Sequence, residues 1–260
     1  CPRTRRVSPA VRERQGSVSG QVTAACVRLG VVTNPDARTE TTAETATASA
    51  SSPVPTAAAP ASLPRRRGAG LYRVIMVCTG NICRSAMAEI VLRDRLTAAG
   101  LPMLEPDGVV VTSAGVSDEE RGNPIDSRAR RVLAEAGYGT GADDVSRATD
   151  IVIASHSAHR ITDAEIAEAD LLLAMTDSHW NVLQRRAAAL EVDPSRIRMY
   201  RELDPTAARQ AEAVVAGRAS RSVLNVPDPW YGTMADFVDT LEVVERVSDE
   251  LADELAALLG

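Results

Sequence analysis

Lysine is absent from this chain of 260 residues, and all of its 29 basic residues are arginine. P-loop nucleotide hydrolases, protein kinases and Schiff-base enzymes each depend on a lysine, as a phosphate ligand or as an amine nucleophile. The standard forms of these three classes are therefore excluded. Aromatic residues make up only 3% of the chain, so a folded core has to be built from aliphatic side chains.

Long apolar runs and cysteine clusters are also missing. No apolar stretch of the sequence reaches the roughly 18 residues of a membrane span, so no membrane contact is expected. The four cysteines are Cys1, Cys26, Cys78 and Cys83. Their spacing fits neither a secreted disulfide framework nor, with the three histidines, a zinc site. We expect a reducing, cytoplasmic location and neither a metal nor another cofactor.

Charge and composition divide the chain near residue 70. Residues 1–70 hold ten arginines against four acidic residues, a net charge of +6, whereas residues 71–260 hold 19 against 31, a net charge of −12. The first part is rich in Ala, Ser, Thr and Pro, and it has too few large apolar side chains to offset the entropy of ordering. We expect a disordered N-terminal segment over 1–70 and one folded domain over 71–260. An acidic domain is not expected to bind nucleic acid.

Strands and helices alternate along the second part. Apolar patterning predicts strands at 71–77, 109–115, 167–176 and 197–200, and helices at 85–100, 125–137, 178–190 and 234–259. This alternation predicts an α/β fold, a single three-layer domain with a four-stranded parallel sheet and helices on both faces. The stretches 138–162 and 203–227 fit the alternation poorly and are expected to be long connections, either functional or disordered.

The residues best suited to catalysis lie between the first strand and the first helix, where residues 77–85 read VCTGNICRS. In a parallel sheet such a turn lies at the carboxyl ends of the strands and points backbone N–H groups at an anion. Gly80 and Asn81 tolerate positive φ, which lets successive amides form an anion nest. Arg84 offers a planar guanidinium for two phosphate oxygens. Cys78, near a helix N-terminus and an arginine, is a candidate thiolate nucleophile.

A simpler interpretation makes Cys78 a buried residue at a strand end and Arg84 a helix-capping residue. The segment 77–85 nevertheless resembles the signature of the low-molecular-weight protein tyrosine phosphatases, and residues 228–232 (DPWYG) resemble that family's general-acid loop. The resemblance extends over roughly residues 72–258 and keeps the order of the family's motifs. It implies that Cys78 is the nucleophile, Arg84 the phosphate ligand and Asp228 the acid that protonates the leaving oxygen.

The same resemblance assigns further site residues. It implies substrate contacts from eight residues: Thr79, Gly80, Asn81, Ile82, Cys83, Ser85, Trp230 and Tyr231. Trp230 and Tyr231 would supply flat apolar walls for a phenyl ring, unless they simply pack within their loop. It also implies a hydrogen-bond network that holds the loop, formed by Asn81, Ser85, Ser113 and His156, with His159 as a nearby competitor for the last position.

By this resemblance the chain is a cysteine-dependent phosphomonoesterase that hydrolyses protein phosphotyrosine through a phosphocysteine intermediate. Some positions depart from the family pattern. Thr79 and Thr176 are similar to the related protein arginine phosphatases, Ala86 replaces a frequent proline, and Glu119 occupies a rim position that is often aromatic. Ile82 is the tyrosine-type residue. A protein arginine phosphatase of the same fold is therefore the alternative.

Two other functions that occur on this fold require features that fit the sequence poorly. Thioredoxin-coupled arsenate reductases need further cysteines downstream, and none follows Cys83. An inactive anion-binding regulatory module would have lost its nucleophile or its acid, and both are present. The expected partner is a phosphorylated protein substrate. The apolar residues of 234–259 could form a dimer seam but are expected to pack on the sheet, which predicts a monomer or weak dimer.

Overall fold

The computed structural model describes residues 62–103 and 107–259. Four strands form one sheet in which every pair is parallel, in the order β2-β1-β3-β4. Their bounds are β1 (Tyr72–Cys78), β2 (Val109–Gly115), β3 (Leu171–Ala174) and β4 (Ile197–Met199). β1 is an inner strand, with Val74 opposite Val111 on one side and Leu171 on the other. The predicted α/β fold with a four-stranded parallel sheet is confirmed.

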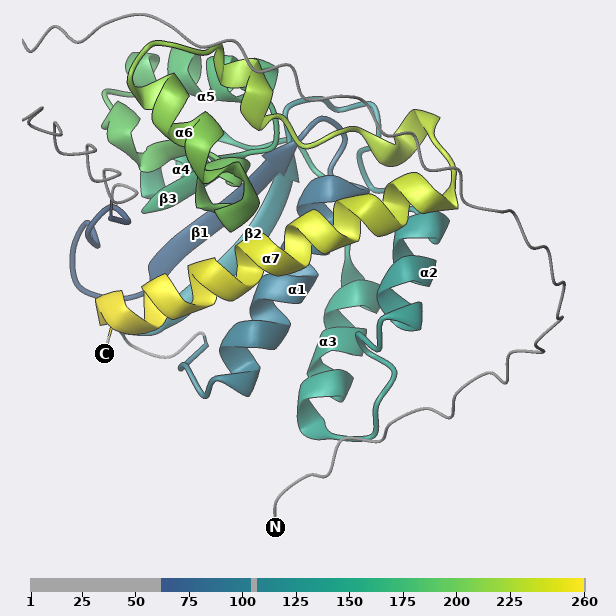
Figure 1. Ribbon diagram of the computed structural model, residues 1–260. Helices are drawn as coiled ribbons and strands as arrows, with labels where there is room; N and C mark the ends of the chain where they lie inside the picture. The colour runs from purple at the N-terminus through teal and green to yellow at the C-terminus, as the bar shows by residue number, and fades with distance from the viewer. Residues whose placement is uncertain (1–61, 104–106, 260) are drawn as a thin grey trace, which may run out of the picture. The chain divides into compact units, whose positions relative to one another are not determined.

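Helices cover both faces of the sheet (Figure 1). One layer consists of α1 (Arg84–Ala98), α2 (Ser127–Glu135), α3 (Asp144–Ser155) and α7 (Met234–Leu259). The other consists of α4 (Asp163–Glu168), α5 (Asp177–Ala189) and α6 (Ala208–Val215). Short 3-10 turns lie at Pro194–Arg196, Tyr200–Leu203, Pro205–Ala207, Arg221–Leu224 and Pro229–Tyr231. No helix in the described ranges is both long and apolar enough to cross a membrane.

The sheet separates two hydrophobic cores. Successive side chains of a strand point to opposite faces, so Val74 and Met76 of β1 enter one core while Ile75 and Val77 enter the other. Both faces are covered, which is why β1 reads as a continuous apolar run rather than an alternating one.

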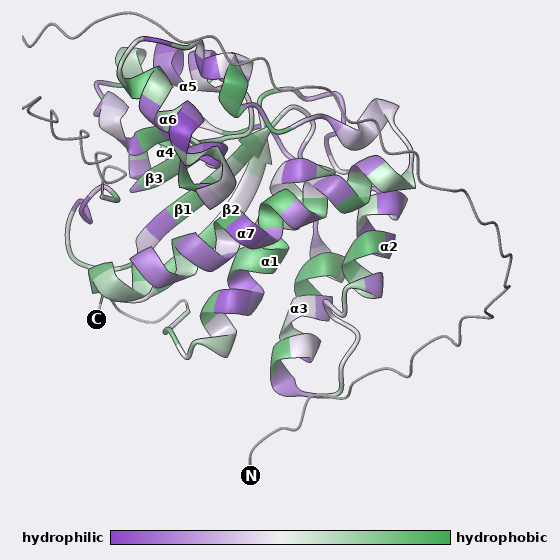
Figure 2. Cartoon of the chain, viewed as in Figure 1, coloured by the Kyte–Doolittle hydropathy of each residue, from purple (hydrophilic) through white to green (hydrophobic). Residues whose placement is uncertain are grey.

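The apolar side of α7 packs within the chain. Figure 2 shows hydrophobic and hydrophilic residues alternating along this helix. Phe237, Leu241, Val244 and Leu251 are buried in the same core as the apolar residues of α1. The apolar pattern of 234–259 is therefore explained by packing inside the domain.

The sequence patterning did not indicate three short helices: α3 and α6, which lie within the two long connections, and α4, which directly follows the first connection. α3 begins after Asp143, whose side chain accepts a hydrogen bond from the Ser146 N–H at 3.0 Å. α4 is a single short helix closed by a capping box, in which Thr162 and Glu165 each accept from the other's backbone N–H. A helix of this length shows no apolar period. Its residues were therefore included in part in the predicted strand 167–176, of which only Leu171–Ala174 is strand.

The expected domain boundary at residue 70 is too late. Leu63 is 5% exposed and belongs to the same hydrophobic core as the buried residues of α1 and α7. The Tyr72 hydroxyl donates to the Pro64 carbonyl at 2.8 Å, and the Arg67 N–H donates to Asp170 at 2.8 Å. Composition does not reveal one anchoring leucine in a polar segment, so residues 62–70 were assigned to the disordered part. The disorder expected for residues 1–61 lies outside the described residues.

Candidate active site

The segment between β1 and α1 forms a tight loop, residues 78–85, which we call the phosphate loop. It passes so close to the end of β2 that a Cβ on Gly115 would lie 2.5 Å from the Thr79 carbonyl oxygen. Backbone bonds fix this contact, because Val116 N–H donates to the Cys78 carbonyl at 2.9 Å and Ser117 N–H donates to the Thr79 carbonyl at 3.0 Å. Glycine at the end of β2 therefore allows the loop to rest on the sheet.

Asn81 is the centre of the support beneath this loop. It is fully buried and has φ of 61°, the left-handed conformation expected for it, whereas Gly80 is not among the residues with positive φ. Its side-chain amide donates to Ser85 Oγ at 3.1 Å and to Ser113 Oγ at 2.8 Å. One side chain thus ties the loop to the start of α1 and to β2.

Both candidate histidines contact Asn81, by different atoms. His156 Nε2 donates to the Asn81 carbonyl at 2.7 Å. The backbone N–H of His159 donates to Asn81 Oδ1 at 3.2 Å. Of the two histidines, His156 therefore contacts Asn81 through its ring, and His159 contacts it through its backbone N–H.

The network continues to Glu89, a residue that the sequence analysis missed. Ser113 Oγ donates to Glu89 Oε2 at 2.6 Å, and Arg93 lies 3.4 Å from the other carboxylate oxygen. Burial raises the pKa of Glu89, against the opposing effects of Ser113 and Arg93. An acidic residue within the buried stretch Arg84–Leu92 of α1 is the sequence signal that could have identified it, since buried carboxylates need partners.

Cys78 ends β1 with its sulfur held by this loop. Sγ accepts from the Asn81 N–H at 3.3 Å and lies 3.0 Å from Ser85 Oγ, and the residue is 2% exposed. Hydrogen bonds of this kind stabilise negative charge on sulfur. Cys83 is also buried and free. Burial raises the pKa of the Cys83 thiol well above its ordinary value, so Cys83 stays protonated at neutral pH.

Arg84 and Asp228 meet across the pocket. Arg84 Nη2 donates to Asp228 Oδ2 at 2.6 Å, although the two residues are 144 positions apart. Arg84 Nη1 donates to the Val226 carbonyl at 3.2 Å. The guanidinium is 4% exposed and the carboxylate 36% exposed. The buried Nε–H of Arg84 has no hydrogen-bond partner among the described residues.

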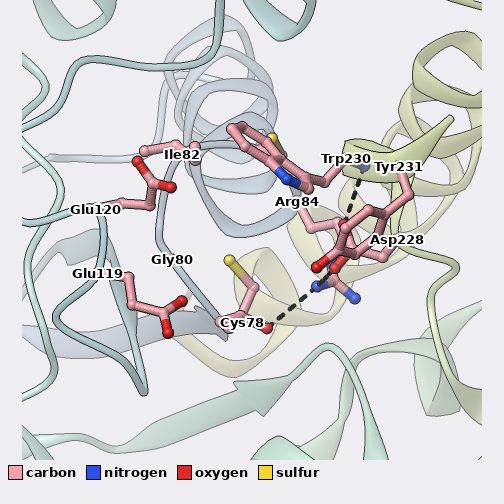
Figure 3. Close-up of a pocket in the computed structure, with 11 residues that line it drawn as sticks. Cys78, Gly80, Ile82, Arg84, Glu119, Glu120, Asp228, Trp230 and Tyr231 are labelled. Atoms are coloured by element: carbon pink, nitrogen blue, oxygen red, sulfur yellow. Dashed lines mark hydrogen bonds and ion pairs between the residues drawn. The ribbon is translucent and has the colours of Figure 1, made fainter. Parts of the chain in front are cut away.

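Nine of the predicted site residues line one pocket. The lining residues are Cys78, Thr79, Gly80, Ile82, Cys83, Arg84, Glu119, Glu120, Asp228, Trp230 and Tyr231. Figure 3 shows Ile82 and the two glutamates on one side, Asp228, Trp230 and Tyr231 on the other, and Cys78 between them. Two predicted substrate contacts, Asn81 and Ser85, do not line this pocket, because their side chains are fully buried in the network below.

The aromatic side of the pocket, residues 228–232, is held by Arg128, which the sequence analysis also missed. Arg128 Nη1 donates to the Trp230 carbonyl at 3.1 Å, and its guanidinium lies 5.3 Å from the centre of the Trp230 ring. Asp126 orients this guanidinium through two contacts of 3.1 Å. Residues 126 and 128 lie at the start of the predicted helix 125–137, and no local pattern relates them to residue 230.

Thr176, a position cited for arginine phosphatases, caps α5, where its Oγ1 accepts from the His179 N–H at 3.4 Å. It does not line the pocket. In the part of the chain that the structure describes, no group of three or more His, Cys, Asp or Glu residues could hold a metal ion.

Comparison with known proteins agrees with this geometry. Residues 73–258 match the family described as low molecular weight phosphotyrosine protein phosphatase. The low molecular weight protein-tyrosine-phosphatase of Streptomyces coelicolor is 38% identical over 69% of this chain and 91% of that protein. Protein-tyrosine phosphatase A of Mycobacterium tuberculosis is 35% identical over 69% and 89%.

Solved structures share the fold. The structure of a protein tyrosine phosphatase from Entamoeba histolytica superposes with a TM-score of 0.53 at 22% identity, covering 72% of this chain and 97% of that one. The match of the family over most of the chain, the identity to curated relatives and the common fold lead to the same conclusion. The chain belongs to the low molecular weight phosphotyrosine protein phosphatase family.

Proposed function

We propose that this protein hydrolyses phosphotyrosine in proteins, with Cys78 as nucleophile, Arg84 as phosphate ligand and Asp228 as general acid. The observation that carries the proposal is that these three side chains line a single pocket (Figure 3), although Asp228 comes from the far end of the chain. The names of the relatives, which are protein-tyrosine phosphatases, support the substrate class.

In the first step the Cys78 thiolate attacks phosphorus, so that an S–P bond forms as the bond from phosphorus to the phenolic oxygen breaks. Arg84 neutralises charge on the equatorial oxygens. A phosphate oxygen would supply the acceptor that its buried Nε–H lacks within the described residues. Asp228 gives its proton to the leaving phenolate oxygen, which then departs as tyrosine.

In the second step a water molecule attacks the phosphocysteine. The Asp228 carboxylate takes a proton from that water, the S–P bond breaks, and inorganic phosphate is released. The sulfur leaves as a thiolate, and the Asn81 N–H directed at Sγ stabilises it. Neither step needs a metal or an organic cofactor.

Asp228 has to change partners during this cycle. In the structure its carboxylate is paired with Arg84 at 2.6 Å. Phosphate oxygens would replace the carboxylate oxygen at the guanidinium, which frees Asp228 to reach the leaving oxygen. Trp230 and Tyr231 would flank the phenyl ring on the same side.

The cellular setting of this chemistry is also part of the proposal. A nucleophilic thiol works best where disulfides do not accumulate, which favours the cytoplasm. The partner is a phosphorylated protein, and the site is complete within one chain, consistent with a monomer or weak dimer.

A phosphoarginine protein is the second candidate substrate. Glu119 and Glu120 line the pocket opposite the aromatic side, and a phosphorylated guanidinium carries positive charge that a phenyl ring lacks. The carboxylates would attract this charge. Direct comparison of phosphotyrosine and phosphoarginine peptides decides between the two substrates.

The mechanism is tested by hydrolysis assays in the presence of a chelator. Cys78→Ser and Arg84→Ala should abolish turnover, since one lacks the thiolate and the other the charge that holds the phosphoryl group. Asp228→Asn should reduce the rate at least about 100-fold for poor leaving groups and much less for good ones, because these need little protonation.

Three outcomes would contradict the proposal. Turnover by Cys78→Ser would exclude Cys78 as the nucleophile. Loss of activity on chelation would show that a metal is required. Equal losses for all leaving groups in Asp228→Asn would exclude the acid role.

A further inference from the structure

His179 lies against the phosphate loop and has no role in the mechanism above. Its side chain is 4% exposed, and its Nε2 lies 2.9 Å from Thr79 Oγ1. His179 is in the first turn of α5, which follows β3, and β3 pairs with β1. The sheet order therefore brings this histidine next to the residue that follows Cys78.

The imidazole of His179 is neutral at physiological pH. Burial, and next the positive charge of Arg84, lower the pKa of His179 to about 3, against a smaller opposing effect of Asp177. Its buried Nδ1 has no hydrogen-bond partner in the described ranges. The bond to Thr79 is therefore the only hydrogen bond that this ring makes within the described chain.

Thr79 links His179 to Arg84. Thr79 Oγ1 also accepts from Arg84 Nη2 at 3.5 Å. A hydroxyl has one proton and two lone pairs, so in either tautomer of the histidine one lone pair of Oγ1 remains for Arg84. His179 thereby fixes the direction in which the Thr79 oxygen presents that lone pair.

The contact between Thr79 Oγ1 and the Arg84 guanidinium becomes more important as the reaction proceeds. Among the described residues, the Arg84 guanidinium has two other partners, the Val226 carbonyl at 3.2 Å and Asp228 at 2.6 Å. Asp228 must release Arg84 before it can protonate the leaving oxygen. The Val226 carbonyl and Thr79 Oγ1 are then the protein acceptors that continue to orient the guanidinium.

We propose that His179 is a positioning residue that acts through the Thr79 hydroxyl to hold the Arg84 guanidinium in the orientation required by the transferring phosphoryl group. The proposal rests on the phosphatase activity proposed above. His179 touches no substrate, and its effect is transmitted through a pocket residue. A misplaced Arg84 guanidinium weakens binding of the transition state more than binding of the substrate. We therefore expect kcat to fall while KM changes little.

Two substitutions of His179 differ in the atom that they preserve. In His179→Gln the amide group occupies about the position of Nε2 and can still reach Thr79, whereas in His179→Asn it ends near the position of Nδ1. We expect His179→Asn to lower kcat about 10-fold with little change in KM, and His179→Gln to restore most of the loss. Inhibition by orthovanadate, which imitates the transferring phosphoryl group, should weaken in His179→Asn more than inhibition by inorganic phosphate.

Thr79→Val removes the hydroxyl group that joins His179 to Arg84 but keeps the shape of the side chain. It therefore tests the same link without altering the buried histidine. If His179 acts through Thr79, the double variant Thr79→Val, His179→Asn should lose no more activity than either single variant. Multiplied losses would overturn the proposal, as would wild-type kcat in His179→Asn. A loss of activity in Thr79→Val that is not matched in His179→Asn would do so too, because His179 would then be dispensable.

These outcomes are separate from those that test the activity itself. If Cys78→Ser remains active, the proposed function fails whatever His179 does. If Cys78→Ser is inactive and His179→Asn hydrolyses phosphotyrosine at the wild-type rate, only the positioning role fails. Melting temperatures of all variants show whether a loss of kcat follows a loss of folded protein.

Discussion

The two sides of the pocket are held in opposite ways. On the phosphate loop, Cys78, Asn81 and Ser85 are at most 2% exposed, and each makes hydrogen bonds within the loop or its support. On the aromatic side, residues 228–232, Trp230 is 40% and Tyr231 91% exposed. Two arginines, Arg84 and Arg128, provide its polar anchors to the rest of the domain.

The difference matches what each side has to do. A cradle for the phosphoryl group stabilises the transition state only if its donors are already in place. The acid, in contrast, must leave Arg84, protonate one oxygen and later accept a proton from water. A loop with few contacts can make these changes at little cost. The comparison predicts that disturbing the support of the phosphate loop affects every substrate, whereas disturbing the anchor of residues 228–232 affects mainly those that need an acid.

Among substitutions in the supports of the two sides, the largest effect is expected from Asn81→Ala. The substitution removes the bonds to Ser85, Ser113 and the His159 N–H, and it places a residue with no stabilising side chain at a φ of 61°. We expect kcat to fall about 100-fold, equally for good and poor leaving groups. Steady-state kinetics on aryl phosphates with leaving groups of different acidity measure this.

Asn81→Gly is the matched control, because glycine adopts positive φ without strain but restores none of the bonds. It should remain nearly as impaired as Asn81→Ala. Recovery of activity in Asn81→Gly would show that backbone strain rather than the network explains the loss, and the contrast between the two sides of the pocket would weaken.

A core position far from both loops separates stability from activity. Leu63 packs near the start of β1, where Pro64 accepts from Tyr72, and Cys78 is at the other end of that strand. Leu63→Ala should lower the free energy of unfolding by about 2 kcal/mol, because it leaves a cavity at the edge of the core. The kcat of the folded protein should not change.

Urea unfolding of Leu63→Ala, with the exposed neighbour changed in Ser62→Ala as control, tests this. If Leu63→Ala is as stable as Ser62→Ala, residues 62–70 do not belong to the cooperative unit, and the boundary expected near residue 70 would hold after all. If kcat falls with stability unchanged, the site depends on the far end of the sheet.

The sequence alone was enough to locate those site residues that lie close together along the chain. Cys78, Asn81 and Arg84 lie within one strand-turn-helix segment, where spacing and glycine content determine the geometry. Asp228 followed only from the resemblance to a family, since no short-range pattern relates it to Arg84. The boundary near residue 70 failed because a single buried leucine has no compositional signature.

The residues that were missed share one physical property. Glu89, Arg128 and His179 contact segments distant in sequence, and each is ordinary in its own helix. The contacts of Glu89 and His179 depend on the sheet order β2-β1-β3-β4, which brings together β1, the end of β2 and the start of α5. The contact of Arg128 depends on how α2 packs beside residues 228–232. The alternation of strands and helices predicts a parallel sheet but leaves the order of its strands open.

The smallest effect is expected from Arg128→Ala, on the aromatic side. Arg128 donates to the Trp230 carbonyl at 3.1 Å and covers the Trp230 ring, while Asp228 keeps its own bond to Arg84. Without Arg128 the loop should hold Asp228 less accurately over the leaving oxygen. We expect kcat to fall about 10-fold for poor leaving groups and hardly at all for good ones.

Arg131→Ala is the matched control, because Arg131 lies on the same helix but is exposed and pairs only with Glu135 in the described chain. It should behave as the wild type. If Arg128→Ala slows all leaving groups equally, Arg128 acts on the phosphate side, where it lies close enough to influence Cys83. In that case the two sides of the pocket are supported as one unit, because a single guanidinium would fix both the acid and the cradle.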